Sequence, residues 1–224
     1  MYLIFDTETT DKPPNDRKDV NPKLDYPRWP RLVQLGFALF DKERKLIKEY
    51  DEIVKPNGDY VISEGAYKTH GIDMETAYAK GIDIVQAVND FYDAMDQAKY
   101  IVCHNMDFDY NIIATEHHRI KFRRMSKPKP LYETKEKICT MKLTTPYCKL
   151  TPKQHWKKDY KWPSLEELHL KLFGYSFKDA HNAIIDVRVT TQCFWELIDR
   201  GVIPLNDPDV YKKELNITKP DVIG

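Results

Sequence analysis

The sequence predicts an α/β protein in which a mixed β-sheet carries helices on both faces. Three patterns lead to this prediction: an apolar and aromatic run at residues 2–5, two further β-prone runs that form a hairpin, and then an alternation of helical and strand-like segments. An opening hairpin followed by alternating helices and strands fits a mixed sheet with helices packed on its faces. The 224 residues suit one large α/β domain better than two small ones.

The expected strands are short and buried. Residues 2–5 form an apolar run that predicts a central strand ending at Asp6. Residues 32–40 and 45–54 are separated by a polar tetrapeptide, which predicts an antiparallel hairpin continuing the sheet. A further buried strand is expected at residues 100–103.

Two helices are expected on either side of this fourth strand. Between residues 82 and 98 the apolar side chains recur as one stripe of an amphipathic helix, at Ile84, Val88, Phe91, Met95 and Ala98. A second helix is expected over about residues 107–118, with Asn105 as its N-cap.

The rest of the chain divides into two more helices and two segments outside the framework. Ser164 and Glu167 form a capping-box pair that predicts the start of one helix, and the last helix is expected over roughly residues 181–200. Residues 12–30 are rich in proline and charge, which predicts a surface insertion. Residues 201–224 are expected to form a short polar tail.

Composition excludes several classes of protein. With 35 basic and 35 acidic residues the net charge is +0, so composition alone does not indicate a nucleic-acid partner. No apolar run is long enough to cross a bilayer, and no export signal is visible at the start of the sequence. The four cysteines form no CxxC pair, which argues against a zinc knuckle or a redox dithiol. We therefore expect a cytoplasmic protein with no membrane association.

The chemistry is expected to reside in acidic residues. Asp6 and Glu8 follow the first strand, and strand alternation sends both side chains to one face, where they can share a divalent cation. On this pair alone, the alternative that they only cap a turn stays open. Asp107 and Asp109 compete for a second acidic position. Asp109 lies one helical turn from Ile113 and so turns toward packed structure, whereas Asp107 can simply favour the helix dipole, so we select Asp109.

A third position combines His181 with Asp186 on the last helix. Asp186 has apolar neighbours, so an uncompensated carboxylate would be costly there, and a bound cation would remove that cost. A lone histidine is more often an ordinary polar residue than a catalyst, so His181 by itself indicates little.

These three positions carry a family resemblance. In order and spacing they resemble the three exonuclease motifs of the DnaQ-like DEDDh family, as Asp6-x-Glu8, His104-Asn105-x-x-Phe108-Asp109 and His181-x-x-x-x-Asp186. Flanking segments look like the same framework, namely Asp6-Thr7-Glu8-Thr9-Thr10, Arg31-Leu32-Val33-Gln34-Leu35-Gly36, His70-Gly71-Ile72 and Pro163-Ser164-Leu165-Glu166-Glu167-Leu168. The resemblance covers roughly residues 1–200, which we expect to be the exonuclease domain.

The resemblance implies a fold, an activity and a set of site residues. It implies a ribonuclease H-like α/β fold with a mixed five-stranded sheet and 3′→5′ exonuclease activity that uses two divalent cations, Mg²⁺ or Mn²⁺. The implied metal ligands are Asp6, Glu8, Asp109 and Asp186, and His181 is the implied general base. The expected partner is the 3′ end of a single strand, with DNA favoured; no protein partner is indicated. An exoribonuclease that trims RNA and a non-catalytic nucleic-acid-binding module are the alternatives.

Substrate contacts are expected at six further residues. Thr7 and Thr10 belong to the first motif and Asn105 to the second. Trp156, Lys157 and Lys158 lie in a run where lysines alternate with aromatic residues, and such a run can neutralise phosphates and stack on bases. The alternative that this run is a solvated loop anchored by its tryptophans stays open.

One segment departs from the family pattern. The family usually has glycine and then an apolar residue after the two threonines, but this chain has Asp11-Lys12. In the family the apolar residue often wedges against the terminal base, so how this chain recognises a strand end is open.

Overall fold

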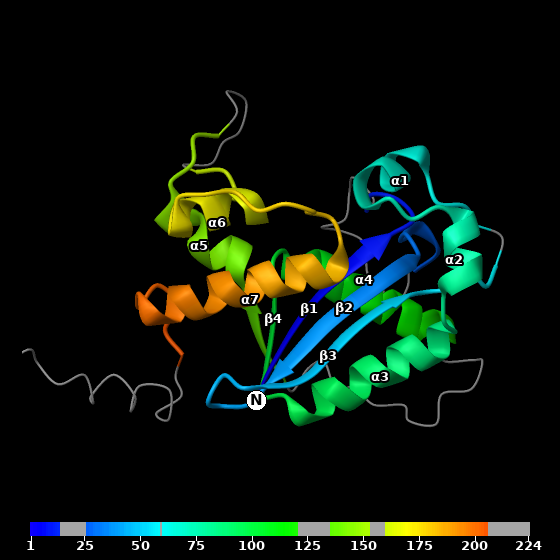
Figure 1. Ribbon diagram of the computed structural model, residues 1–224, viewed down its shortest axis with the longest axis horizontal. Coiled ribbons are helices and arrows are strands. Elements are labelled where there is room, and N and C mark those ends of the chain that lie inside the picture. Colours follow the sequence, from blue (N-terminus) through cyan, green and yellow to red (C-terminus); the bar gives the residue numbers. More distant parts are fainter. Residues whose placement is uncertain (14–25, 59, 121–134, 153–159, 206–224) are drawn as a thin grey trace, which may run out of the picture.

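Figure 1 shows the computed structural model, which describes residues 1–13, 26–58, 60–120, 135–152 and 160–205. One five-stranded sheet lies at its centre, with strand order β3-β2-β1-β4-β5. The strands are β1 (Tyr2–Thr9), β2 (Leu32–Phe40), β3 (Leu46–Ile53), β4 (Tyr100–Cys103) and β5 (Glu136–Cys139). The pairs β1–β2 and β2–β3 are antiparallel, and β1–β4 and β4–β5 are parallel. The predicted mixed sheet is confirmed.

The central strand is longer than predicted. We expected it to end at Asp6, but β1 continues to Thr9 because its antiparallel pairing with β2 continues to Leu32. On its other side, β1 pairs with β4 only as far as Ile4. The C-terminal half of β1 therefore extends past β4, which leaves the backbone on that side available to other partners.

Seven α-helices and one short 3-10 helix accompany the sheet in the described ranges: η1 (Tyr26–Arg28), α1 (Glu64–His70), α2 (Met74–Lys80), α3 (Ile84–Gln97), α4 (Met106–Ile120), α5 (Thr140–Cys148), α6 (Leu165–Phe173) and α7 (Ala183–Asp199). The predicted amphipathic helix is α3, and the predicted capping box at Ser164 and Glu167 is present at α6. The last helix starts at Ala183 rather than His181, because the Asn182 side chain caps it.

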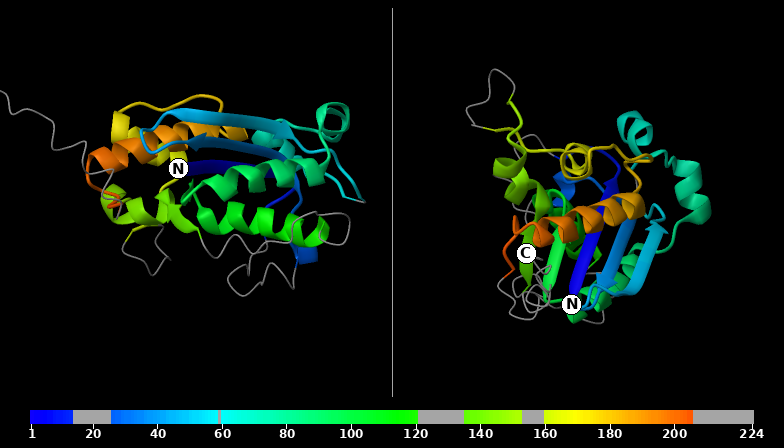
Figure 2. Two further views of the ribbon diagram at one scale, coloured as in Figure 1. Left: turned by 90° about the horizontal axis from the view of Figure 1, so that it is seen from below. Right: turned by 60° about the vertical axis from the view of Figure 1, so that its left-hand side comes forward.

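Each face of the sheet is covered by its own helices, as Figure 2 shows. Leu3 and Phe5 of β1 pack in one core cluster with residues of α3 and α4. Tyr2 and Ile4 pack in a second cluster with residues of α6 and α7. This alternation continues along the strand, so the side chain of Asp6 follows Ile4 toward the α7 face. No helix in the described part of the chain is both long enough and apolar enough to cross a bilayer.

The segments expected to lie outside the framework are partly integrated into it. Trp29, near the end of the predicted insertion 12–30, is only 2% exposed and belongs to the core cluster under α4. Ile203 and Leu205, at the start of the predicted tail 201–224, are buried beside α7. These apolar side chains bury area that a surface segment would leave in water. Residues 14–25 and 206–224 lie outside the described residues.

Candidate active site

The site begins on the C-terminal half of β1. Asp6 and Glu8 are two residues apart on this strand, so their side chains share the face toward α7, as the alternation predicted. Glu8 is 8% exposed and lies opposite Gln34 of β2. The two acids are thereby held on a central strand at the edge where β1 passes the end of β4.

Asp186 reaches the same place from the first turn of α7. The helix can approach the sheet because β2 has a glycine at the crossing: a Cβ on Gly36 would lie 2.7 Å from the carbonyl carbon of Ala183. Gln34 fixes the end of the helix, since its Oε1 accepts from the Ala183 backbone N–H at 3.2 Å and its Nε2 donates to Asp51 Oδ1 at 2.7 Å. The N-terminus of α7 is thus seated directly on β2.

Asp109 comes from α4, on the opposite face of the sheet. Its Oδ1 accepts from the backbone N–H of Thr7 at 3.1 Å and from the Thr7 hydroxyl at 2.7 Å. That N–H is available because β1 extends beyond its pairing with β4. Asp107 lies elsewhere: its side chain is exposed and accepts from Lys142 Nζ at 2.5 Å. The structure therefore brings Asp109, and not Asp107, to the other acids.

The four carboxyl groups perturb one another. Burial raises the pKa of Asp6 well above its usual value, and the charges of Asp109, Glu8 and Asp186 raise it further. Burial also raises the pKa of Glu8 to about 8, with added repulsion from Asp186 and Asp109. Burial raises the pKa of Asp109 to about 7 and that of Asp186 to about 6, against the hydrogen bonds that each accepts. Because burial and mutual repulsion disfavour the ionised carboxylates, a bound cation would stabilise them.

The donor set fits a divalent cation. Asp186 is 8% exposed, and its buried Oδ1 has no hydrogen-bond partner although its Oδ2 accepts from the His181 backbone N–H at 2.9 Å. A buried oxygen without a partner is costly, and a cation would satisfy it. Carboxylate oxygens are also the hard ligands that Mg²⁺ and Mn²⁺ prefer.

His181 lies at the open side of this cluster. It precedes the cap of α7, has a left-handed φ of 66°, and is exposed. One of its ring nitrogens and one carboxylate oxygen each from Glu8 and Asp186 lie within 4.8 Å of one another. The ring can therefore act either on a water molecule held among the acids or as a ligand itself.

A cleft of about 270 Å³ opens beside Glu8. Part of its wall comes from the end of β1 and the residues that follow, part from the start of α4, and part from α1, and the lining residues are Glu8, Thr9, Asp11, Lys12, Pro13, Gly65, Ala66, Thr69, His70, Asn105 and Phe108. Asp11 and Lys12, the departure from the family pattern, are among them, and Phe108 supplies an apolar surface. His70-Gly71-Ile72 was recognised as family framework, but helix α1 and its place in the cleft were not predicted, although Ser63 and Gly71, which cap α1 at its two ends, are typical helix-ending residues.

The expected substrate-contacting residues fall into three groups. Asn105 lines the cleft. Thr7 and Thr10 are buried, and their hydroxyls are engaged within the protein: Thr7 donates to Asp109, and Thr10 accepts from the Arg31 backbone N–H at 2.9 Å. The third group, Trp156, Lys157 and Lys158, lies outside the described residues.

His104, the first residue of the second motif, links the elements that surround the site. Its Nε2 lies 3.0 Å from the carbonyl oxygen of Pro163, and its Nδ1 lies 2.9 Å from the Thr140 hydroxyl. Because a carbonyl only accepts, Nε2 carries the proton and Nδ1 accepts from Thr140. Burial lowers the pKa of His104 to about 4, so it stays neutral and ties the end of β4 to α5 and to the residues before α6.

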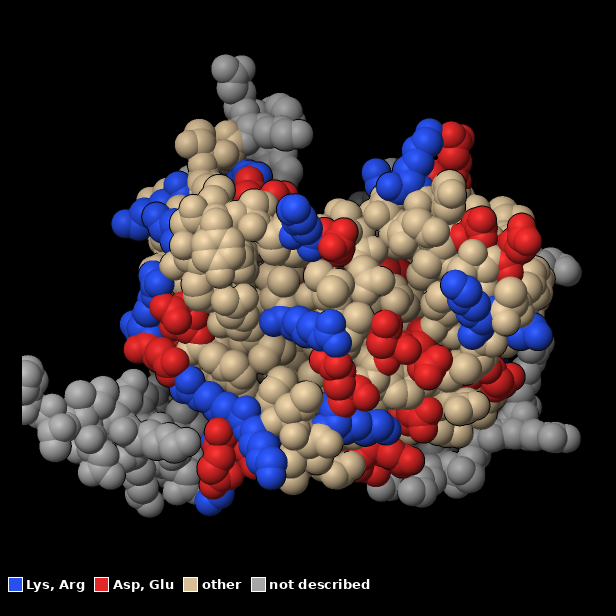
Figure 3. All heavy atoms as spheres, viewed as in Figure 1, with Lys and Arg blue, Asp and Glu red and all other residues tan. Residues whose placement is uncertain are grey.

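The face of the molecule seen in Figure 3 carries no large patch of a single charge. Acidic and basic side chains are interspersed there, and the surface is hollowed between α1 and α6. This distribution agrees with the net charge of +0.

Comparison with known proteins supports a nuclease. A family model described as exonuclease matches residues 3–194. Among solved structures, Escherichia coli exonuclease I in complex with a dT13 oligonucleotide matches with a TM-score of 0.65 and 21% sequence identity. The matched region covers 96% of this chain and 43% of the exonuclease I chain. The zinc-bound form of the E. coli exonuclease I complex with single-stranded DNA has a TM-score of 0.65 and 21% identity, covering 96% of this chain and 42% of its own. A search of the curated proteins finds no match.

These likenesses confirm the predicted ribonuclease H-like α/β fold. The chain spans less than half of the length of exonuclease I.

Proposed function

The chain belongs to the exonuclease family, and from this premise we propose that it is a divalent-metal-dependent 3′→5′ exonuclease that shortens single-stranded DNA. The observation that carries the proposal is the convergence of four acids beside an open cleft: Asp6, Glu8, Asp109 and Asp186. Buried carboxylates that raise one another's pKa destabilise the protein unless something positive joins them. A cation-binding function accounts for their presence.

We assign the ligands from the positions of the acids. Asp6, Glu8 and Asp186 would hold one Mg²⁺ or Mn²⁺ ion, and Asp6 with Asp109 would hold a second. When bound, two such ions stabilise the attacking and leaving oxygens of an in-line displacement at phosphorus. The protein's own part is to keep the ligands in place: Thr7 orients Asp109 through two hydrogen bonds, and the His181 backbone N–H orients Asp186.

His181 is proposed as the general base. Imidazole is the side chain whose protonation changes most readily near neutral pH, and this ring is exposed at the edge of the acid cluster. A water molecule held among the acids would give its proton to the ring as it attacks the phosphate. The left-handed backbone at His181 places the residue outside the helix, where its N–H faces Asp186 and its ring stays accessible.

The cleft is proposed to hold the terminal nucleotide. It adjoins Glu8, so a nucleotide bound in it would present its phosphate to the acids. Phe108 and Ala66 offer apolar surface to a base or sugar, and Asn105 offers an amide for hydrogen bonding. Single-stranded DNA is the proposed substrate because the fold resembles that of exonuclease I, whose structures hold single-stranded oligonucleotides.

We propose residues 1–200 as the exonuclease domain. The family model matches nearly the same range, residues 3–194, which supports this assignment. The buried positions of Ile203 and Leu205 add that the domain's core continues slightly beyond residue 200.

The test is degradation of 5′-labelled single-stranded DNA, duplex DNA and RNA with Mg²⁺, Mn²⁺ or a chelator. We expect a ladder of 5′-labelled products from single-stranded DNA, formed only with metal. Immediate release of the label as a mononucleotide would show degradation from the 5′ end, which contradicts the proposed 3′→5′ polarity. Faster loss of RNA would favour the exoribonuclease alternative, and binding without degradation would favour a non-catalytic module.

A further inference from the structure

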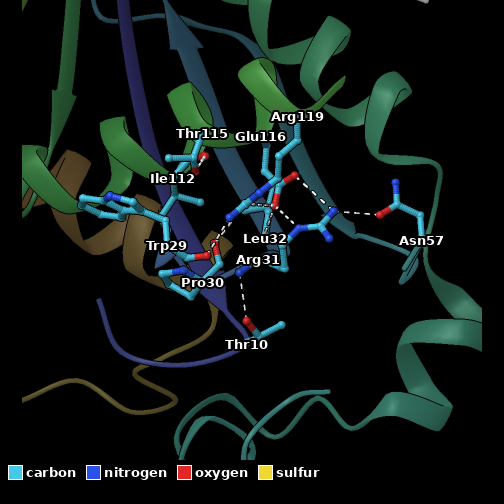
Figure 4. A network of polar contacts seen from close by, with 10 residues as sticks. All are labelled: Thr10, Trp29, Pro30, Arg31, Leu32, Asn57, Ile112, Thr115, Glu116 and Arg119. Atoms are coloured by element: carbon cyan, nitrogen blue, oxygen red, sulfur yellow. Dashed lines mark hydrogen bonds and ion pairs between the residues drawn. The ribbon is translucent and has the colours of Figure 1, made fainter. Parts of the chain in front are cut away.

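A buried acid on α4 takes no part in the proposed chemistry. Glu116 is 0% exposed and lies two helical turns beyond Asp109 on α4. Its Oε1 accepts from Arg31 Nε at 2.7 Å, from an Arg119 guanidinium nitrogen at 2.8 Å and from the Leu32 backbone N–H at 3.2 Å, and its Oε2 accepts from Arg31 at 3.3 Å (Figure 4). These contacts engage both oxygens of the carboxylate, so Glu116 serves to hold Arg31, Arg119 and the start of β2 together.

Arg31 extends from this acid toward the other side of the cleft. The nitrogen that contacts Glu116 Oε2 also donates to Asn57 Oδ1 at 2.8 Å, as Figure 4 shows. The guanidinium lies over the ring of Tyr60, 4.4 Å from its centroid. Asn57 and Tyr60 belong to the segment that leads into α1. The Arg31 side chain thus joins α4 to the segment that precedes α1.

The backbone of Arg31 reinforces the same connection through Thr10. The Thr10 N–H donates to the Arg31 carbonyl at 2.9 Å, and the Arg31 N–H donates to the Thr10 hydroxyl at 2.9 Å. The Thr10 carbonyl accepts from the N–H of Ser63, the N-cap of α1, at 2.9 Å. The end of β1 is therefore held between Arg31 and the start of α1.

These elements are the walls of the cleft. Asn105 and Phe108 of the α4 region line one side, and Thr9 with Ala66 and His70 lines the side formed by β1 and α1. We propose that Arg31 is a positioning residue that fixes the separation of these two walls and so sets how tightly the cleft holds a terminal nucleotide. This inference rests on the proposed function, because it takes a nucleotide as the occupant.

The role requires arginine rather than any cation. A guanidinium presents several donors in a planar fork and can stack on a ring at the same time. Lysine at this position would keep the charge beside Glu116, but its single ammonium could not also reach Asn57 and cover Tyr60. Charge and positioning can therefore be separated by substitution.

Two variants test the role without removing the buried acid. Asn57→Ala removes the hydrogen bond from Arg31 to the α1 side and leaves the stack on Tyr60 and the pair with Glu116 in place. Loss of a hydrogen bond to a charged group is expected to raise KM for a 5′-labelled oligothymidylate about tenfold, with kcat within about twofold and Tm lowered by only a few degrees. Arg31→Lys should raise KM at least as much. The Kd for the same oligonucleotide, measured by anisotropy with Ca²⁺ in place of Mg²⁺, should rise in parallel.

Arg200→Lys is the matched control. Arg200 also joins several elements, through Glu196, the Tyr147 hydroxyl and the Leu172 carbonyl, but it lies at the far end of α7 from the acids. Its KM and Kd should stay at the wild-type values. Unchanged KM and Kd in both Asn57→Ala and Arg31→Lys would overturn the proposal, as would a fall in kcat with constant KM or an equal rise in Arg200→Lys. Absence of hydrolysis by the wild-type protein would instead refute the proposed function, while the Kd values would still test Arg31.

Discussion

Asp107 and Asp109 are two residues apart on α4, yet their surroundings differ in every respect that matters for a metal ligand. Asp109 is 2% exposed, accepts two hydrogen bonds from Thr7 and has its pKa raised by burial. Asp107 is exposed and forms an ion pair with Lys142. The helix turns one acid into the site and the other into solvent, where an ion pair is worth little.

This difference predicts opposite effects of the two alanine substitutions. Asp109→Ala should lower kcat on a 5′-labelled single strand by more than about 10²-fold, because even a small misplacement of a catalytic group costs that much. Asp107→Ala, the matched control, should stay within about threefold of wild type, since it loses only an exposed ion pair. The reverse pattern, with Asp107→Ala inactive and Asp109→Ala active, would show that the wrong acid had been assigned.

His181 presents the other question at this scale, because its ring lies close enough to Glu8 and Asp186 to be a ligand. As a general base, His181→Ala should lose about 10²- to 10⁴-fold in kcat and keep its affinity for Mn²⁺. Calorimetric titration with Mn²⁺ separates the two roles, with Asp186→Ala as the variant that should lose both activity and affinity. If His181→Ala lost as much Mn²⁺ affinity as Asp186→Ala, the histidine would be a ligand.

At the scale of elements, the site depends on how α7 is seated on β2. Asp186 and the backbone of His181 are set by the first turn of α7, and that turn is set by Gln34 and Gly36. The Gln34 side chain hydrogen-bonds to Asp51 and to the Ala183 backbone, and Gly36 contributes by having no side chain. The arrangement therefore makes the spacing between helix and sheet part of the catalytic geometry.

Gly36→Ala should disturb catalysis through this spacing. The added Cβ would lie 2.7 to 2.9 Å from backbone atoms of Ala183 and Ile184, which cannot rotate away, so the helix must shift. Overpacking of this kind costs about 1–3 kcal/mol of stability. We expect kcat to fall by about 10²-fold, because a shift of about 1 Å is enough for that loss.

Circular dichroism melting and steady-state kinetics together check this expectation. Gly174→Ala is the control, since its Cβ would meet nothing within 4 Å while its left-handed φ of 81° strains alanine, so Tm should fall without a change in kcat. A Gly36→Ala protein with lowered Tm but wild-type kcat would mean that the close packing of α7 on β2 affects stability and not catalysis.

At the scale of the whole molecule, the acid cluster makes stability depend on pH and on metal. The pKa of Asp186 is raised to about 6, that of Asp109 to about 7 and that of Glu8 to about 8 in the folded protein. The folded state therefore holds protons that the unfolded state has already released. For groups with raised pKa values, the stability present at low pH is lost as the pH rises through the folded values.

The metal-free protein should consequently melt at lower temperature as the pH is raised from about 5 to about 8.5 in EDTA. Mg²⁺ should stabilise it by an amount that grows over the same range, because the ion binds the ionised acids. Asp186→Asn should flatten the slope in EDTA, since one ionising group is gone. A melting temperature that rises with pH in EDTA would contradict the raised pKa values.

Local patterns explain which parts of the fold could be predicted from the sequence. The apolar stripe of α3 and the capping box of α6 lie within short windows, so periodicity and residue type suffice to find them. β5 has two charged residues among its four and buries only Ile138, so it lacks the apolar run that reveals the equally short β4. α1 and α2 have seven residues each, which is too short for a helical repeat to be recognised. α5 contains Pro146, which in a sequence argues against a helix.

For the site, the sequence by itself determined the residue types and their order along the chain, including the four acids of the three motifs and His181. The tertiary structure decided which of them meet and what surrounds them. Thr7 and Asp109 are 102 residues apart, Arg31 and Glu116 are 85 apart, and Gln34 and Ala183 are 149 apart. Spacing along a chain reports only on neighbours within a helix or strand, so contacts of this range exist only once the two faces of the sheet have been packed.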